Sequence, residues 1–474
     1  MTPLRPESRL IALIVATSFF MQGLDTSIMN TSLPQMALSL GVAPLDLSQG
    51  ITLYMLSAAA FVPLCGWLAD RFGERRIFVI SILIFTGASL LCGIAQNLWE
   101  FTAARILQGL GGALMTPVGR MIVLRNADKS ELLHATALIT WPALAAPIIG
   151  PALGGFITTY ISWRWNFLLN VPLGIAGIVM IMRHIPKAEA AHANQLDWSG
   201  LVLSAVALIA MLYGLELLSH ARIDWVAYEW TLPIVLTLLG VGFSWLSIRH
   251  FQRTTQPLLE LSTASVQTYR MSTLTAGACF RTAIHATPFL LPLLFQVGFG
   301  MNALGAGSLL LIYFVGNLGI KPITSPILTR FGFRTVLLVN GCLAGAAIML
   351  CAIFAADTPR WQMIPILLLA GATRSMQFTC LNTMAFADTT PAQRSSSTTL
   401  FGMFNQVANV LGVALSTLVI NLSLFVMPYM QAGIAEIRYG FIAMGLLAIG
   451  SALMFVKLPK DAGAEVSGHQ PRTR

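Results

Sequence analysis

Residues 77–95 read IFVISILIFTGASLLCGIA, nineteen positions without an acidic or basic side chain. At about 1.5 Å of rise per residue, a helix of this length crosses a bilayer hydrocarbon core that is about 30 Å thick. Comparable apolar stretches recur along the whole chain. The predicted spans are 10–33, 48–69, 77–95, 99–121, 136–156, 163–183, 198–218, 230–249, 271–292, 304–328, 334–355, 361–384, 397–420 and 437–457. The sequence therefore predicts an all-α integral membrane protein with 14 transmembrane helices.

Composition and charge placement support a membrane protein and argue against a nucleic-acid partner. Hydrophobic residues make up 56% of the chain and charged residues 10%, far from the averages of soluble domains. The net charge of +9 comes mostly from alternate loops. These loops carry Arg71, Arg75, Arg76, Arg120, Arg125, Lys129, Arg183, Lys187, Arg249, Arg253, Arg270, Arg330 and Arg334, whereas the opposite loops carry little beyond Arg164, Arg222, Arg360 and Arg438. The positive-inside rule then places the basic loops and both termini in the cytoplasm.

Signatures of catalysis and metal binding are missing from the sequence. The six cysteines fall inside apolar spans, and none lies at metal-ligand spacing. There is no P-loop, HExxH or GxSxG motif. The first span is too long for a signal-peptide core and contains Asp25, so we interpret it as helix one. The sequence predicts neither an enzyme nor a metal site.

Three short matches indicate an internal repeat. Residues 105–108 (RILQ) match 374–377 (RSMQ), and 150–153 (GPAL) match 412–415 (GVAL). The loop at 70–75 (DRFGER) matches TRFGFR at 329–334 in the same order. Such a repeat predicts two duplicated six-helix halves around an inserted helix pair. The predicted division is an N-terminal half at 1–190, the inserted pair at 191–255, a C-terminal half at 256–460 and a tail at 461–474.

The loop at 66–76 reads GWLADRFGERR and is the strongest local signal. Gly66 allows a neighbouring helix to approach closely, and Gly73 permits a tight turn. Asp70 can cap the next helix or pair with a basic group across the interface between the halves. The loop, with Arg71 and Arg75, is therefore a candidate conformational latch. The alternative is an ordinary positive-inside loop.

Two opposite charges inside the first half form a candidate proton site. Asp25 and Arg105 lie at about 12 Å and 9 Å from the same side of the membrane, at about 1.5 Å per residue, so they can pair. Desolvation favours the neutral form of a carboxyl group, whereas an adjacent guanidinium favours the ionised form. We predict Asp25 as proton carrier and Arg105 as the group that tunes it. A static structural pair is the alternative.

The second half has several cations and no acidic residue inside its predicted spans. Arg281 and His285 are four residues apart and share one helix face. Lys321 and Arg374 lie deep in the helices predicted at 304–328 and 361–384. These cations either attract anionic substrates, exchange contacts with Asp25 across the cleft, or only fix the packing. The full set of candidate cavity residues is Asn30, Gln108, Arg281, His285, Lys321, Arg374 and Gln377.

Four motifs together resemble one known family. The loop at 66–76 resembles the signature of the major facilitator superfamily. Residues 24–34 (LDTSIMNTSLP) are similar to the helix-one signature of its fourteen-helix drug:proton antiporter branch, and 105–113 (RILQGLGGA) resemble the helix-four signature. Residues 147–155 (PIIGPALGG) resemble the helix-five antiporter signature, which marks Gly150, Pro151, Gly154 and Gly155. Ala146 replaces the first glycine of that signature, and Thr329 replaces the acid of the second-half loop.

This resemblance implies a major facilitator fold and a proton-coupled antiporter that exports small, amphipathic or toxic compounds by alternating access. The expected location is the bacterial inner membrane. The expected partners are the substrate, protons and lipid, with no nucleic acid and no cofactor beyond the proton gradient. We expect a monomer. The sequence does not decide whether a periplasmic adaptor protein binds to the outer loops. Two alternatives also stay open, namely a transporter of a specific anionic metabolite and a non-transporting membrane sensor or scaffold.

Overall fold

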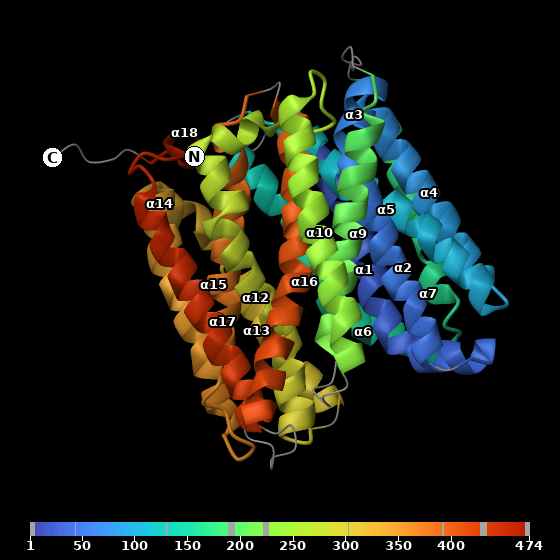
Figure 1. The fold of residues 1–474 in the computed structure, drawn as a ribbon, viewed down its shortest axis with the longest axis vertical. Coiled ribbons are helices and arrows are strands. Elements are labelled where there is room, and N and C mark those ends of the chain that lie inside the picture. Colours follow the sequence, from blue (N-terminus) through green and yellow to red (C-terminus); the bar gives the residue numbers. More distant parts are fainter. Residues whose placement is uncertain are drawn as a thin grey trace.

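The computed structural model describes residues 5–42, 44–128, 131–187, 195–220, 227–301, 303–390, 393–426 and 434–469. Within these ranges all regular structure is helical. The long helices stand side by side in one bundle (Figure 1). The predicted all-α membrane fold class is thereby confirmed.

The first part of the chain forms the helices up to residue 184. They are α1 (Pro6–Leu40), α2 (Pro44–Phe61), α3 (Cys65–Phe72), α4 (Glu74–Ile94), α5 (Leu98–Asn126), α6 (Leu132–Tyr160), α7 (Trp165–Leu168) and α8 (Asn170–His184). A short 3-10 turn, Val62–Leu64, joins α2 to α3. Side-chain hydrogen bonds cap the start of α5. Asn97 Oδ1 accepts a hydrogen bond from Glu100 N at 2.9 Å, and Glu100 Oε2 accepts one from Gln96 N at 2.9 Å.

The remainder of the chain forms ten further α-helices among the described residues. They are α9 (Trp198–His220), α10 (Ala227–Arg253), α11 (Gln267–Tyr269), α12 (Ala276–Leu293), α13 (Ala303–Gly319), α14 (Lys321–Cys351), α15 (Arg360–Ala387), α16 (Arg394–Val426), α17 (Ile434–Met454) and α18 (Ala464–Ser467).

The predicted span 304–328 is divided between α13 and α14, because Pro322 in the first turn of α14 has no N–H to donate. Ile320, between the two helices, keeps helical backbone angles, with a φ of −75° and a ψ of −19°. The predicted boundary between the spans 304–328 and 334–355 lies at Gly332, whose φ of 72° separates two helical parts of α14. A glycine adopts this left-handed conformation without strain. Gly73, with a φ of 85°, separates α3 from α4 at the matching loop of the first half.

Twelve helical segments among the described residues are long and apolar enough to cross a membrane. Helix α13 contains a shorter apolar segment, Gly305–Gly319. Large hydrophobic side chains such as Leu83, Leu238 and Leu446 are exposed on the outside of the bundle, as expected for a surface that faces lipid. The chain is therefore a multi-pass membrane protein. The count of 14 spans and the division into halves stay predictions.

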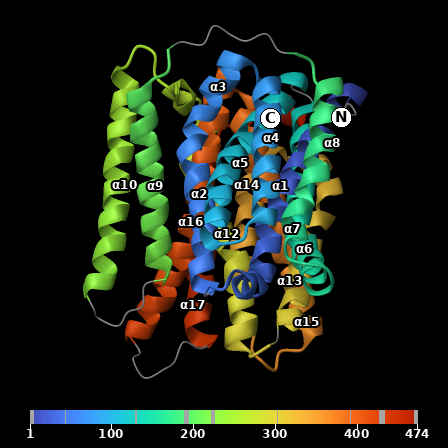
Figure 2. The same ribbon diagram turned by 90° about the vertical axis from the view of Figure 1, so that its right-hand side faces the viewer.

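Helices α9 and α10, which the sequence predicts as an inserted pair, stand at one edge of the bundle (Figure 2). Helix α10 packs against α9, and α9 contacts both α2 and α16. Leu208 and Leu212 of α9 form a buried cluster with Ala59 of α2. Helix α9 therefore bridges α2 and α16.

One end of the bundle carries most of the basic side chains, and we call it the basic end. Both described termini lie there, at the top of Figure 1. The C-terminal segment packs on the second-half loop, where Thr329 Oγ1 donates to the Ser467 carbonyl at 3.0 Å. A ring nitrogen of His469 lies 3.0 Å from the Thr329 carbonyl. Thr329, which replaces the expected acid, thus holds the C-terminal segment.

The N-terminus is held at the basic end by Glu131, which precedes α6. Glu131 Oε1 accepts from Arg5 N at 2.7 Å, and Oε2 accepts from Ser8 Oγ at 3.0 Å and from Asp128 N at 3.2 Å. Burial favours the neutral form of Glu131, but these hydrogen bonds outweigh burial and lower its pKa below the ordinary value of 4.5.

This lowered pKa predicts a pH-dependent contribution to stability. The contribution is fully present above about pH 4.5 and is lost as the pH falls through the lower folded-state pKa. We expect Glu131→Gln to destabilise the protein by about 1–3 kcal/mol at pH 7. The difference in thermal unfolding temperature from wild type should shrink under acid conditions. Glu7→Gln, on an exposed acid of the same terminus, should have little effect; a pH-independent difference for Glu131→Gln would contradict the prediction.

Candidate functional site

Asp25 and Arg105 form a buried ion pair between α1 and α5. Arg105 Nη1 donates to Asp25 Oδ2 at 2.8 Å and to Gln108 Oε1 at 2.6 Å. Gln108 Nε2 donates to Asp25 Oδ1 and to Ser89 Oγ, both at 2.8 Å. Asn170 Nδ2 donates to the same Asp25 oxygen at 3.0 Å. Four helices, α1, α4, α5 and α8, thus converge on one carboxylate.

Burial makes this network costly to disturb. Asp25 is 3% exposed and Arg105 1% exposed. Charge-assisted hydrogen bonds are stronger than neutral ones, and removing one partner of a buried pair leaves an uncompensated charge. Both Asp25 oxygens have donors here. Any protonation of Asp25 must therefore rearrange the donors that surround it.

Tyr54 of α2 connects the ion pair to its surroundings. The Arg105 guanidinium lies 4.3 Å from the centre of the Tyr54 ring, a cation–π contact. Gln22 Nε2 lies within 3.5 Å of the Tyr54 hydroxyl and donates to the Gly112 carbonyl at 3.2 Å. Thr116 Oγ1 donates to Gln22 Oε1 at 2.8 Å.

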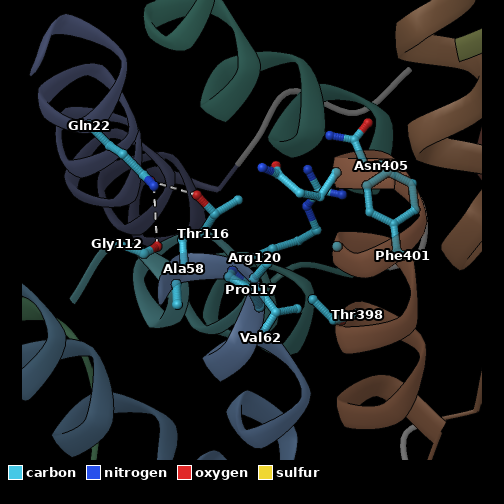
Figure 3. A pocket seen from close by; sticks show the side chains of 14 residues that line it. Gln22, Ala58, Val62, Gly112, Thr116, Pro117, Arg120, Thr398, Phe401 and Asn405 are labelled. Carbon is cyan, nitrogen blue, oxygen red and sulfur yellow. Dashed lines mark hydrogen bonds between the residues drawn. The ribbon is translucent and has the colours of Figure 1, made fainter. Parts of the chain in front are cut away.

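Gln22, Gly112 and Thr116 line a pocket between the first half and α16. Its volume is about 200 Å³. Figure 3 shows the side chains that surround it. The lining residues are Gln22, Ala58, Ala59, Val62, Gly112, Ala113, Thr116, Pro117, Arg120, Thr398, Phe401, Gly402, Asn405 and Gln406. We call this the central pocket.

The structure corrects the position of Arg120, which the sequence places in a basic loop. Helix α5 continues to Asn126, and the Arg120 guanidinium turns inward, 4.3 Å from the centre of the Phe401 ring. Its Nε and Nη1 atoms are buried and have no hydrogen-bond partner among the described residues. The positive-inside rule uses only the sequence position of a cation, so it does not indicate the direction in which the side chain points.

Arg281 of α12 lies against the same ring. Its guanidinium carbon is 4.6 Å from the centre of Phe401, and the residue is 1% exposed. Arg281 Nη1 donates to the Ser272 carbonyl at 2.6 Å, and Nη2 donates to Asn382 Oδ1 at 3.2 Å. The bonding of this residue to backbone and amide oxygens matches the packing alternative.

The remaining cations of the second half lie outside the central pocket. Lys321 Nζ donates to Thr379 Oγ1 at 2.7 Å. The guanidinium carbon of Arg374 lies 5.6 Å from the centre of Phe378, and the His285 ring packs edge-on against that ring at 5.3 Å.

Gln377 lies between α14 and α15. It donates to the Leu337 carbonyl at 3.0 Å and accepts from Asn340 Nδ2 at 2.8 Å. It therefore contributes to packing between these helices and does not line the central pocket.

The loop at 66–76 lies at the basic end and touches α16. A Cβ atom at Gly66 would lie 2.7 Å from Ser395 Oγ and 3.1 Å from Thr399 Oγ1, so a larger residue would require these two hydroxyl groups to move. Asp70 lies near Ser395 and Arg125. Arg75 donates a hydrogen bond to the Met182 carbonyl of α8. Arg71 is not free either, because its side chain has an interaction partner. Gly73 makes the turn into α4.

The helix-five motif forms part of the seam between α1 and α6. A Cβ atom at Gly150 would overlap Ser27 Oγ, which donates to the Ala146 carbonyl at 3.2 Å. Gly154 is buried, whereas an added Cβ atom at Gly155 would meet nothing within 4 Å. The side chain of Pro151, like that of Asn30 on α1, lies outside the described residues.

Because Gly150 and Gly155 have different surroundings, we expect the same substitution, glycine to alanine, to have different effects at the two positions. Gly150→Ala must force α1 and α6 apart, and we expect a destabilisation of about 1–3 kcal/mol. Gly155→Ala should be neutral or slightly stabilising, because alanine suits a helix interior better than glycine. Thermal unfolding of the purified protein in detergent measures both. Equal effects of the two substitutions would contradict a close seam at Gly150.

Comparison with known proteins decides the family. The family model of the Major Facilitator Superfamily matches residues 15–412 and 273–473. The chain belongs to the major facilitator superfamily. Members of this superfamily are transporters and not enzymes.

The curated relatives of this major facilitator chain include proteins provisionally named multidrug resistance protein MdtD. The one from Pectobacterium carotovorum is 34% identical over 452 residues, covering 94% of this chain and 95% of the relative. The one from Escherichia coli is 32% identical over 475 residues, covering 98% of each.

Solved structures of the superfamily share the fold. The human organic anion transporter MFSD10 (TETRAN) superposes with a TM-score of 0.65 at 13% identity, covering 95% of this chain and 100% of that one. The proton:xylose symporter XylE gives 0.63 at 12% identity, covering 97% and 98%. The predicted major facilitator fold is therefore confirmed.

Several residues of this superfamily member escape prediction from its sequence. Ser89, Asn170 and Tyr54 complete the Asp25 network, but nothing in their local sequence marks them. The inward position of Arg120, in contrast, is indicated by a pattern in the sequence. Gln108, Gly112, Thr116 and Arg120 recur every four residues, so they share the face of α5 that meets the network and the central pocket.

Proposed function

We propose that this protein is a proton-coupled antiporter that exports small amphipathic compounds across the bacterial inner membrane by alternating access, with both termini in the cytoplasm. One observation carries the proposal: the buried carboxylate of Asp25 is linked through Arg105 and Tyr54 to the central pocket. The names of the curated relatives support multidrug export.

Proton and substrate occupancy would be coupled through this linkage. Protonation of Asp25 removes the charge that Arg105 binds and converts one acceptor oxygen into a donor. Arg105 then loses its main partner, and Tyr54 packs directly on its guanidinium. The Tyr54 hydroxyl contacts Gln22, a lining residue of the central pocket. A change at Asp25 thus reaches the pocket through two side chains.

The access change would take place where the first half meets α16. At the basic end Gly66 packs against Ser395 and Thr399. Gly402 of α16 lies against Pro117 and Val62 at the edge of the central pocket. Separation of α16 from these contacts would open the pocket toward the basic end, which we assign to the cytoplasm.

The proton gradient supplies enough free energy for this exchange. A proton that moves inward releases about 2.3 kcal/mol per 100 mV of membrane potential. Because about 1.4 kcal/mol corresponds to a tenfold ratio, one proton that enters at 100 mV can sustain a roughly 40-fold gradient of an uncharged substrate.

Reconstitution in proteoliposomes tests the proposal. Vesicles with an imposed proton gradient and a trapped pH indicator receive a panel of amphipathic cations, anions and neutral compounds. We expect at least one compound to move against its gradient while protons move in the opposite direction. An ionophore that collapses the proton gradient should stop that movement. Transport that continues unchanged after the collapse would contradict proton coupling.

A further inference from the structure

The central pocket has an unusual charge balance. Its lining includes Arg120 but no acidic residue. A second guanidinium, that of Arg281, lies against the same Phe401 ring, and the two cations repel each other. Tyr269 is the titratable group beside both. Its hydroxyl donates to the Ser397 carbonyl at 2.7 Å, and a tyrosine is neutral at pH 7.

Two donor nitrogens of Arg120 are also left without partners in the described part of the chain. Nε and Nη1 are buried without a hydrogen bond among the described residues, although buried polar groups are nearly always bonded. Arg281 makes two hydrogen bonds, but its Nε is likewise unpartnered. An unpaired buried cation is unfavourable unless something compensates its charge.

The space in front of Arg120 has room and apolar surface for a small ligand. Arg120, Phe401 and Asn405 point toward the same space in Figure 3. The pocket volume of about 200 Å³ equals about seven water molecules at about 30 Å³ each. Val62, Pro117 and Phe401 supply apolar contacts. The arrangement suits a compound with one acidic group and a small apolar or aromatic body.

We propose that Arg120 is the anion-binding residue of the substrate site and that the transported compounds are organic anions. An arginine fork binds a carboxylate with two parallel hydrogen bonds. The carboxylate of the ligand would supply the acceptors and the negative charge that the described residues do not place beside Arg120. Phe401 would pack against the apolar body of the ligand. This inference rests on the proposed export function and specifies its substrate class.

Equilibrium binding to the full-length protein in detergent, without any proton gradient, tests the inference. Three probes share one ring and differ in charge: benzoate, benzamide and benzylamine. At pH 8 we expect benzoate to bind at least about 10-fold more tightly than the other two, in line with about 1.5–3 kcal/mol for a charged hydrogen bond. Equal binding of the three probes would overturn the inference.

Substitution of Arg120 separates a ligand-binding role from a structural one. Arg120→Gln should lose the preference for benzoate, and Arg120→Lys should keep part of it. Without ligand, Arg120→Gln should raise the thermal unfolding temperature, because it removes a half-buried charge that has no acidic partner among the described residues. A purely structural arginine predicts a lower unfolding temperature and unchanged benzoate binding. Either of these results would overturn the inference.

A control variant and the transport behaviour of wild type separate this inference from the proposed function. Asp357→Asn, on an exposed acid in the loop before α15, should keep the preference for benzoate. If wild type binds benzoate preferentially but moves no compound against its gradient, the proton-coupled function fails and the anion site stands. If it exchanges protons for cations only, the function stands and the anion site fails.

Discussion

Asp25→Asn is expected to reduce proton-driven transport by about 100-fold or more, the scale typical for loss of a proton-transferring group. Asparagine has the shape of aspartate and can still accept hydrogen bonds from Gln108 and Asn170 through one oxygen. It cannot bind or release a proton. Because Arg105 loses its counter-charge, the variant should be less stable than wild type. The loss of transport should nevertheless fall on proton coupling. Rates of substrate movement and proton movement in proteoliposomes measure the effect.

Exchange of labelled for unlabelled substrate provides the internal control for Asp25→Asn. This exchange needs no net proton movement, so it should continue in the variant. Asp357→Asn, on an exposed acid in the loop before α15, should behave as wild type in both assays. Normal proton movement in Asp25→Asn would exclude Asp25 as the carrier.

Arg105→Gln should have the second large effect, this time on stability as well as transport. It leaves the Asp25 carboxylate buried without its cation, and breaking such a pair costs about 3–5 kcal/mol. It also removes the cation–π contact with Tyr54. We expect a clearly lower free energy of unfolding and no proton-coupled transport.

A double-mutant cycle distinguishes the ion pair from independent contributions. Asp25→Asn combined with Arg105→Gln removes both charges, so much of the stability lost in Arg105→Gln should return. Transport should not return, because no proton carrier remains. Strictly additive losses of stability would mean that the two side chains act independently.

Much of the fold follows from sequence because the bilayer imposes one simple constraint. Each apolar stretch must form a helix that satisfies its own backbone hydrogen bonds, and the span predicted at 77–95 matches α4 at Glu74–Ile94 within a few residues. The break before Lys321 escaped prediction, since the apolar run continues across it and only Pro322 marks the new start. Likewise, no sequence feature assigns the polar C-terminal segment to the loop at Thr329.

The candidate site was predictable only where charge made burial expensive. Asp25 and Arg105 stand out because an ionised group inside an apolar span needs a partner. Ser89, Asn170 and Tyr54 carry no charge, and the packing of separate helices brings them to the carboxylate. The prediction for Arg120 was wrong for a different reason. Arg120 lies near the end of a predicted span, so we assigned it to a basic loop. Its inward direction depends on how far α5 extends and on the neighbouring α16.

Reversible protonation of Asp25 is the central claim, and infrared difference spectroscopy measures it most directly. The carboxyl band of wild type, with Asp25→Asn as the reference, is followed through a pH titration with and without a transported compound. The proposed coupling predicts a protonated carboxyl band that appears within the working pH range and shifts when the compound binds. A band that shows Asp25 permanently ionised under both conditions would contradict it.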